Sequence, residues 1–304
     1  MQDPDPGFSP LPGVAETLRP GLRRILAPNA SPMTYRGTNT YLLGTRNLAV
    51  IDPGPQDERH LAAILAALTP AQQISHILVT HAHIDHSPLA RDLSAATGAA
   101  VLAYGDAQAG RSAVMERLSR DGLAGGGEGV DAAFAPDQCL RDGARVIGDE
   151  WEVIAHHTPG HFGNHLCFEW EDALFSGDLV MGWATSLVSP PDGDLTDFMA
   201  SCAAMHARAP AVLYPGHGRE VTEAMTRISA LIAHRNGREA EILAALSDGA
   251  ATADALARRI YRETPAALMG AATRNVFAHL VDLYGKNRVT AEPELSSSAI
   301  FSRV

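Results

Sequence analysis

Residues 77–87 hold the sequence Ile-Leu-Val-Thr-His-Ala-His-Ile-Asp-His-Ser. The apolar half continues a β-branched run from Ile74, which predicts a buried strand over 74–80. If the extended backbone continues, His81 and His83 point to the same side, because side-chain direction alternates along a strand. Imidazole and carboxylate are ligands of Zn²⁺, Fe²⁺ and Mn²⁺. The stretch therefore predicts a metal site at a strand end; the alternative is a hydrogen-bonded histidine cluster at a surface turn.

Three further ligand candidates each follow a predicted strand. They are His161 in Thr158-Pro-Gly-His, Asp178 in Ser176-Gly-Asp and His217 in Pro215-Gly-His-Gly. A single histidine beside a Gly-Pro turn is more often an ordinary loop residue. Loop residues on a rigid sheet tend to carry function, however, and the four segments in this order favour one shared site.

The remaining periodicity predicts two domains. Strands and helices mix from residue 39 to residue 214, which is typical of a layered α/β domain. From about Ile228 the chain becomes helix-rich and ends in a predicted hairpin, as in a small winged-helix domain. The expected boundaries are 1–227 and 228–304. Strands are expected at 39–43, 48–52, 74–80, 100–104, 145–147, 151–156, 165–170, 173–176 and 211–214, helices at 58–68, 87–97, 107–120, 195–209, 220–235, 234–246, 253–261 and 266–283, and the hairpin at 287–290 and 299–303.

Composition limits the partners and the compartment. A net charge of −11 over 304 residues disfavours nucleic-acid binding through a broad basic surface. Residues 228–304 carry nine Lys and Arg against eight Asp and Glu, so no duplex DNA is expected there, although Arg274, Asn275 and His279 are polar candidates on the third helix. The N-terminus is acidic and proline-rich, unlike a signal peptide, and no apolar run reaches the ~20 residues of a membrane span. We expect a cytoplasmic protein without a membrane partner.

The seven candidates together resemble the signature of the metallo-β-lactamase superfamily, H-x-H-x-D-H followed by His, Asp and His. The resemblance implies an αβ/βα sandwich over about residues 15–225, with the site at one edge. It also implies two metal ions with a fixed set of ligands. The first would be held by His81, His83 and His161, the second by Asp85, His86 and His217, and Asp178 would bridge them.

Other segments narrow the resemblance to the β-lactamase-like protein 2 group. They are Gly37 to Leu42, the His161 to His165 spacing, the 234–239 run, Ile260-Tyr261 and Thr264-Pro265. That group carries a C-terminal winged-helix-like domain. Its best-known animal members cut single-stranded RNA, and its many bacterial members are mostly of unsettled substrate.

We therefore expect an enzyme, a metal-dependent hydrolase with two divalent ions, zinc first and iron or manganese as alternatives. Two ions about 3.5 to 4 Å apart can share a water, lower its pKa and present hydroxide. Asp85 is the catalytic candidate, because it can orient the hydroxide or carry a proton to the leaving group. The expected substrate is a small ester, thioester or lactone; the alternatives are a phosphodiesterase or endoribonuclease acting on single-stranded RNA, and redox chemistry at iron.

Several residues near the motifs keep two interpretations. Asp52 either supports a ligand histidine or only forms a turn, and His165 is either a rim group or a strand residue bonded to backbone. Met33, Tyr35 and the 183–191 segment either wall a pocket or pack the core. The C-terminal domain is expected to serve packing, pocket covering or homodimer formation.

Overall fold

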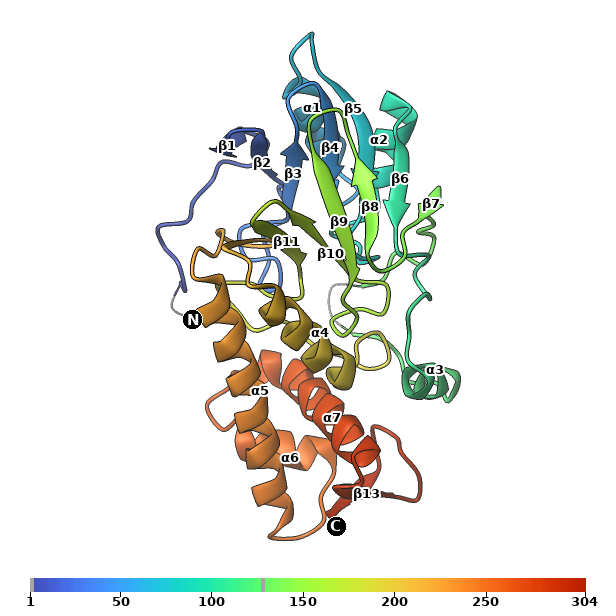
Figure 1. Ribbon diagram of the computed structural model, residues 1–304. Coiled ribbons are helices and arrows are strands. Elements are labelled where there is room, and N and C mark those ends of the chain that lie inside the picture. The colour runs from blue at the N-terminus through green and yellow to red at the C-terminus, as the bar shows by residue number, and fades with distance from the viewer. Residues whose placement is uncertain (1–2, 127–128) are drawn as a thin grey trace.

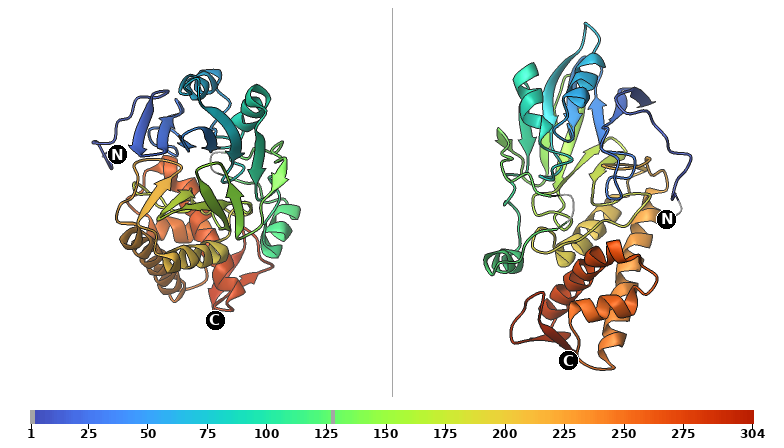
Figure 2. Two further views of the ribbon diagram at one scale, coloured as in Figure 1. Left: turned by 45° about the horizontal axis from the view of Figure 1, so that its top comes forward. Right: turned by 180° about the vertical axis from the view of Figure 1, so that it is seen from behind.

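A computed structural model describes residues 3–126 and 129–304. Two β-sheets face each other with helices on their outer sides, and a helical C-terminal domain extends from one end (Figures 1 and 2). The expected α/β sandwich followed by a small helical domain is confirmed.

The first sheet has seven strands in the order β1 to β7. Neighbours are antiparallel from β1 to β4 and parallel from β4 to β7. Three of its strands, β1, β2 and β7, were not predicted: the charged residues of β2 hide its alternation, and β7 has only two residues. The bounds are β1 (Ala15–Arg19), β2 (Leu22–Leu26), β3 (Asn39–Leu43), β4 (Asn47–Ile51), β5 (Gln73–Leu78), β6 (Ala100–Ala103) and β7 (Gln138–Cys139).

The second sheet has five strands in the order β12-β11-β10-β9-β8. Only β11 and β12 are parallel to each other. Its bounds are β8 (Ala144–Ile147), β9 (Glu152–His157), β10 (Leu166–Trp170), β11 (Ala173–Gly177) and β12 (Val212–Pro215).

Side-chain alternation assigns each face of the first sheet to a different core. Leu42, Val50 and Ile77 pack outward under α1 (Glu58–Ala66) and α2 (Leu89–Thr97). Their neighbours Leu43 and Leu78 point inward to the second sheet, where they meet side chains such as Phe168. Because both faces are buried, the strand register is fixed and the strand ends that carry the site are held in place.

Two helices cover the outer face of the second sheet, α4 (Leu195–Arg208) and α5 (Ala224–Leu246). The sequence predicted two helices where α5 is a single one, so that prediction was wrong. The helix continues through Gly237, because packing of both its halves offsets the cost of about 1 kcal/mol for one internal glycine. The boundary expected after residue 227 falls inside this helix, which runs from the sandwich into the C-terminal domain (Figure 1).

The C-terminal domain adds α6 (Ala253–Ile260), the 3₁₀ turn η1 (Ala266–Leu268), α7 (Met269–Gly285), β13 (Val289–Glu292) and β14 (Ile300–Arg303). Its core also takes Met115 and Leu118 from α3 (Ala113–Arg120) of the sandwich. The helix expected from residue 107 begins only after Ser112, whose side chain caps α3. Among the described residues, no helix is both long and apolar enough to cross a bilayer.

Candidate metal centre

The seven predicted ligands lie together at one edge of the sandwich, and all are at most 8% exposed. One segment, His81 to His86, connects β5 to α2. His161 lies between β9 and β10, while Asp178 follows β11 and His217 follows β12. Ends of strands from both sheets therefore supply the cluster, and the structure brings together every site residue that the sequence indicated.

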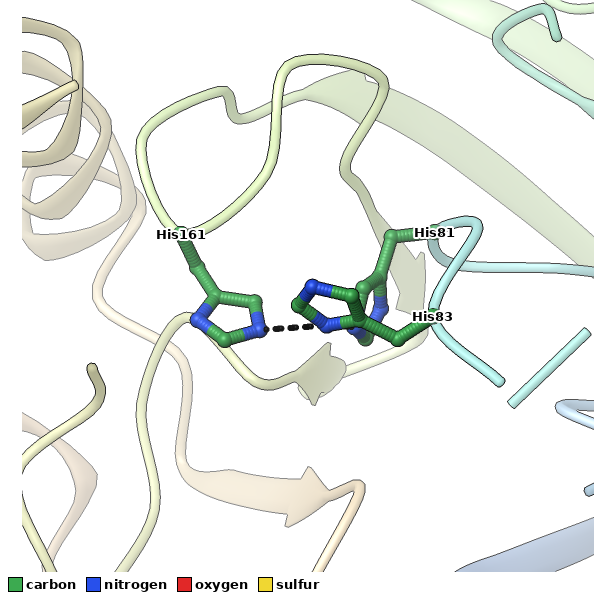
Figure 3. Close-up of side chains that lie close together, drawn as sticks. All are labelled: His81, His83 and His161. Atoms are coloured by element: carbon green, nitrogen blue, oxygen red, sulfur yellow. Dashed lines mark hydrogen bonds between the residues drawn. The ribbon is translucent and has the colours of Figure 1, made fainter. Parts of the chain in front are cut away.

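The first group consists of His81, His83 and His161, whose rings converge in Figure 3. Nδ1 of His83 lies 2.9 Å from Nε2 of His81 and 3.1 Å from Nε2 of His161. All three nitrogens lie within 4.8 Å of one another. Three imidazoles at this spacing can share one divalent ion.

The second group consists of Asp85, His86 and His217. Nε2 of His217 lies 3.1 Å from Oδ2 of Asp85 and 3.3 Å from Nε2 of His86. Asp178 lies between the two groups, with Oδ2 at 3.4 Å from Nε2 of His217 and 3.7 Å from Nε2 of His161. Its carboxylate is therefore within reach of a cation in either group.

Asp52 supports one histidine of each group. Its Oδ2 accepts a hydrogen bond from Nδ1 of His86 at 2.8 Å and another from the Thr80 hydroxyl at 2.8 Å. Thr80 in turn accepts from Nδ1 of His81 at 2.9 Å. With Nδ1 protonated, Nε2 of each histidine is the free nitrogen that faces the cluster. The interpretation of Asp52 as a support for ligand histidines is the one that the geometry favours.

Backbone carbonyls orient two other histidines in the same way. Nδ1 of His161 donates to the Leu187 carbonyl at 2.7 Å, and Nδ1 of His217 donates to the Gly37 carbonyl at 3.1 Å. Both leave Nε2 turned toward the cluster. Both carbonyls lie in segments that the sequence singled out for other reasons, 37–42 and 183–191, and nothing in the sequence indicated this role.

Charge differs between the two groups. Burial and the neighbouring His161 lower the pKa of His83 to about 3, so the first group is neutral at pH 7. Burial also opposes the charged form of His217, but the carboxylates of Asp178 and Asp85 outweigh it and raise the pKa to about 10. In the second group, the carboxylates and the histidines thus stabilise each other's charged forms.

Unpartnered oxygens show that the cluster suits cations. Both oxygens of Asp85 and Oδ1 of Asp178 are buried and make no hydrogen bond within the described part of the chain, although Oδ2 of Asp85 lies near His217. A buried carboxylate without partners is costly, and a coordinated metal ion removes that cost. Neutral imidazoles beside such carboxylates are the donor set that divalent transition metals prefer.

Two motif glycines are required by close packing at the cluster. A Cβ on Gly216 would lie 2.4 Å from Oδ1 of Asp178 and 2.6 Å from a ring carbon of His86. Gly177 has φ +47°, and its Cβ would lie 2.6 Å from Nε2 of His165. The Pro-Gly-His and Ser-Gly-Asp motifs therefore have a steric cause as well as a chemical one.

The remaining histidines near the motifs have structural partners. Nδ1 of His165 contacts the Thr158 hydroxyl at 2.9 Å, and its Nε2 accepts from the Asp178 backbone N–H at 3.2 Å. His165 is thus a buried strand-end residue that positions Asp178, and not a rim group. His156 contacts Glu169 and His157 stacks on Tyr104, as a structural role predicts.

A cavity of about 310 Å³ opens onto the cluster, and we call it the interdomain pocket. His83, His161 and Asp178 form one part of its lining, and Met33, Trp183 and other residues of the 181–192 segment form a mostly apolar wall. Of the expected wall residues, Tyr35 stands behind this lining and stacks on Trp183 with ring centroids 5.0 Å apart.

The C-terminal domain closes the pocket with Tyr261, Thr264, Leu268, Ala271, Ala272 and Asn275. Sequence reasoning gave Tyr261 no role in the site and considered Asn275 only as a possible DNA contact. The three polar candidates of the third helix are engaged within the chain: Arg274 bonds loop carbonyls, Asn275 lines the pocket and His279 is buried. Pocket covering is the role that this geometry gives the domain.

Comparison with known proteins agrees with the fold and the ligand cluster. A family model described as the metallo-β-lactamase superfamily matches residues 33–217. The chain belongs to the metallo-β-lactamase superfamily. A second model, described as a β-lactamase associated winged helix domain, matches residues 252–296. The chain is thus a metallo-β-lactamase superfamily hydrolase with a winged-helix domain that follows the catalytic domain in the sequence.

Individual relatives cover most of the chain. A β-lactamase-like protein 2 homolog of Drosophila melanogaster is 31% identical over 288 residues, which are 88% of this chain and 89% of the relative. The atrochrysone carboxyl ACP thioesterase AgnL7 of Paecilomyces divaricatus is 33% identical over 244 residues, or 78% and 68% of the two chains. The crystal structure of a β-lactamase domain protein from Burkholderia ambifaria shares the fold, with a TM-score of 0.80, 22% identity and coverage of 98% and 96%.

Proposed function

We propose that this metallo-β-lactamase superfamily member is a binuclear metal-dependent hydrolase of small acyl substrates, thioesters first and esters or lactones next. The interdomain pocket is the observation that carries the proposal. It is mostly apolar, measures about 310 Å³ and opens directly onto the ligand cluster. Small-molecule sites have this size and lining, with a few polar groups that orient the ligand.

Two divalent ions, zinc first, are the proposed cofactors. His81, His83 and His161 would hold one ion, Asp85, His86 and His217 the other, and Asp178 would contact both. Ions held there would lower the pKa of a water and supply hydroxide for attack on a carbonyl carbon. The chain itself fixes the histidine tautomers through Asp52, Thr80 and backbone carbonyls.

Asp85 is the proposed catalytic residue. Its side chain is 5% exposed, and neither oxygen makes a hydrogen bond within the described part of the chain. One oxygen can therefore hold a cation while the other is free to accept a proton or to orient a water. A positioned carboxylate of this kind contributes about 10²- to 10⁴-fold to a rate.

Thioesters are the preferred class for two reasons. One relative is a thioesterase, and it is 33% identical over 78% of this chain. The pocket is also closed on one side by the C-terminal domain, and the chain carries a net charge of −11. Single-stranded RNA needs cationic surface along its backbone, which this balance of charge disfavours.

The test is one panel of substrates on zinc-loaded protein: acyl thioesters, esters, lactones, a phosphodiester and single-stranded RNA. We expect thioester hydrolysis that disappears in His83→Ala and on chelation, and that returns with zinc. His206→Ala is the matched control, because His206 is a helix-surface residue bonded to Ser229. RNA cleavage that depends on His83, without any acyl hydrolysis, would replace this proposal by the endoribonuclease alternative.

A further inference from the structure

The wall that the C-terminal domain contributes to the interdomain pocket is not apolar throughout. Tyr261, directly after α6, and Asn275, on α7, both line the pocket. Neither belongs to the metal centre. They are polar groups in a mostly apolar cavity, and such groups usually fix the orientation of a ligand.

Hydrogen-bond direction along this wall is set by Arg235 of α5. Its Nη1 donates to Oδ1 of Asn275 at 2.7 Å, and a guanidinium has only donors. The amide of Asn275 must therefore turn its Nδ2 the other way, where it donates to the Tyr261 hydroxyl at 3.3 Å. The tyrosine oxygen is an acceptor in this chain, and its own hydrogen has no acceptor among the described residues. The wall thus offers the pocket a hydrogen-bond donor.

The positively charged Arg235 lies next to Asn275, on the side away from Tyr261. Arg235 is 1% exposed and forms no ion pair with any residue that the structure describes; its other partners are the Ser186 carbonyl and the Phe198 ring. Burial lowers its pKa to about 10, which leaves the guanidinium charged at neutral pH. Arg238 lies over the Tyr261 ring at 4.2 Å and strengthens the donor further, even though it also pairs with Glu241.

The acids of the pocket do not neutralise this wall. Asp192 pairs with Arg111 at 2.7 Å, and Asp178 belongs to the ligand cluster. An alkyl chain placed against Tyr261 would leave a buried hydroxyl hydrogen unpaired, which is unfavourable. An oxygen acceptor in the same place would complete the series of hydrogen bonds that runs from Arg235 through Asn275 to Tyr261.

We propose that the Tyr261–Asn275 wall binds an oxygen atom, carboxylate or ketone, on the acyl group of the substrate away from its scissile carbonyl. This deepens the proposed hydrolase function and rests on it. The substrate class is then an oxygenated acyl thioester instead of a plain fatty acyl thioester. Tyr261 and Asn275 are specificity residues, and Arg235 is the residue that positions them.

The kinetic test compares matched N-acetylcysteamine thioesters on the zinc-loaded full chain: alkanoyl, terminal-carboxylate and ω-1-oxo acyl groups, each from four to ten carbons. We expect at least one oxygenated series to exceed its alkanoyl counterpart about tenfold or more in kcat/KM at its best length, mainly through KM. Tyr261→Phe and Asn275→Leu should reduce this ratio to near one. Tyr284→Phe, a half-exposed tyrosine of α7, should keep it.

A binding experiment separates this proposal from the hydrolase proposal. Calorimetry measures binding of the free acids, which needs no turnover. The acids span the same chain lengths and include hexanoate, 5-oxohexanoate and glutarate. Tighter binding of an oxygenated acid, weakened selectively by Tyr261→Phe, supports the proposed role of the Tyr261–Asn275 wall even if no thioester is cleaved. Comparison of the oxo acid with the diacid tells whether the wall binds a ketone or a carboxylate. Two results would overturn the proposal. One is that, at every length, the alkanoates bind and their thioesters react as well as both oxygenated series. The other is a preference for oxygenated groups that Tyr261→Phe and Asn275→Leu leave unchanged.

Discussion

Asp52 and His86 form a buried hydrogen bond of 2.8 Å between Oδ2 and Nδ1, and the same carboxylate supports His81 through Thr80. Asp52→Asn would place an amide donor against Nδ1 of His86 and disfavour the required tautomer. We expect metal affinity to fall by about 10- to 100-fold, the usual effect of losing such a partner. Zinc competition with a chelator measures it. Asp121→Asn, on an exposed turn, is the control; equal affinity in Asp52→Asn would contradict the role given to Asp52.

Asp85→Asn tests the proposed proton acceptor. Asparagine keeps an oxygen for a cation but accepts no proton at neutral pH, so we expect kcat to fall by about 10²-fold or more. Metal content, measured by atomic emission on the same sample, must be reported with the rate. Normal turnover at full metal content would exclude a catalytic role for Asp85, whereas loss of one metal would make it a ligand first.

Asp197, in the first turn of α4, predicts a pH-dependent stability. Burial, with a smaller contribution from Asp194, raises its pKa to about 6, against an ordinary value of 3.8. The folded protein therefore favours the protonated acid, and its stability falls as pH rises from about 4 to 6. Asp197→Asn should raise the Tm by about 1–3 °C at pH 7.5 and by little at pH 4. A gain that is equal at both pH values would assign the effect to something other than the charge.

Arg274 connects the C-terminal domain to two loops at the pocket. It donates to the carbonyls of Ala124 and Gly125 at 2.9 Å, to the Ser189 hydroxyl at 3.1 Å and to the Pro190 carbonyl at 3.0 Å. Arg274→Ala should raise KM about 3- to 10-fold with a smaller change in kcat, because these bonds shape the wall and not the cluster. Steady-state kinetics beside a thermal melt checks this, with the exposed Arg288→Ala as control. A loss confined to kcat would be the wrong result for a wall residue.

Several strands and the candidate ligands that follow them could be predicted from the sequence. Strand β3 was predicted at its observed bounds and the ends of β5 and β11 to within two residues, because buried strands have short apolar runs. The seven candidate ligands were found because metal-binding side chains directly follow predicted strands, in three of the four segments beside a glycine turn. One helix prediction failed: α5 is a single helix, since its two halves pack on different domains and a single glycine does not end a helix.

The sequence by itself indicated the seven candidate ligands, since histidine and carboxylate side chains next to predicted strand ends are local features of the chain. Only the tertiary structure decided which atoms hold those ligands and what forms the pocket wall. The Leu187 and Gly37 carbonyls that orient His161 and His217 are backbone atoms, which have no signature in sequence. Tyr261 and Asn275 lie about 100 residues or more from His161 along the chain, and they reach the pocket because α5 carries the C-terminal domain back over the cluster.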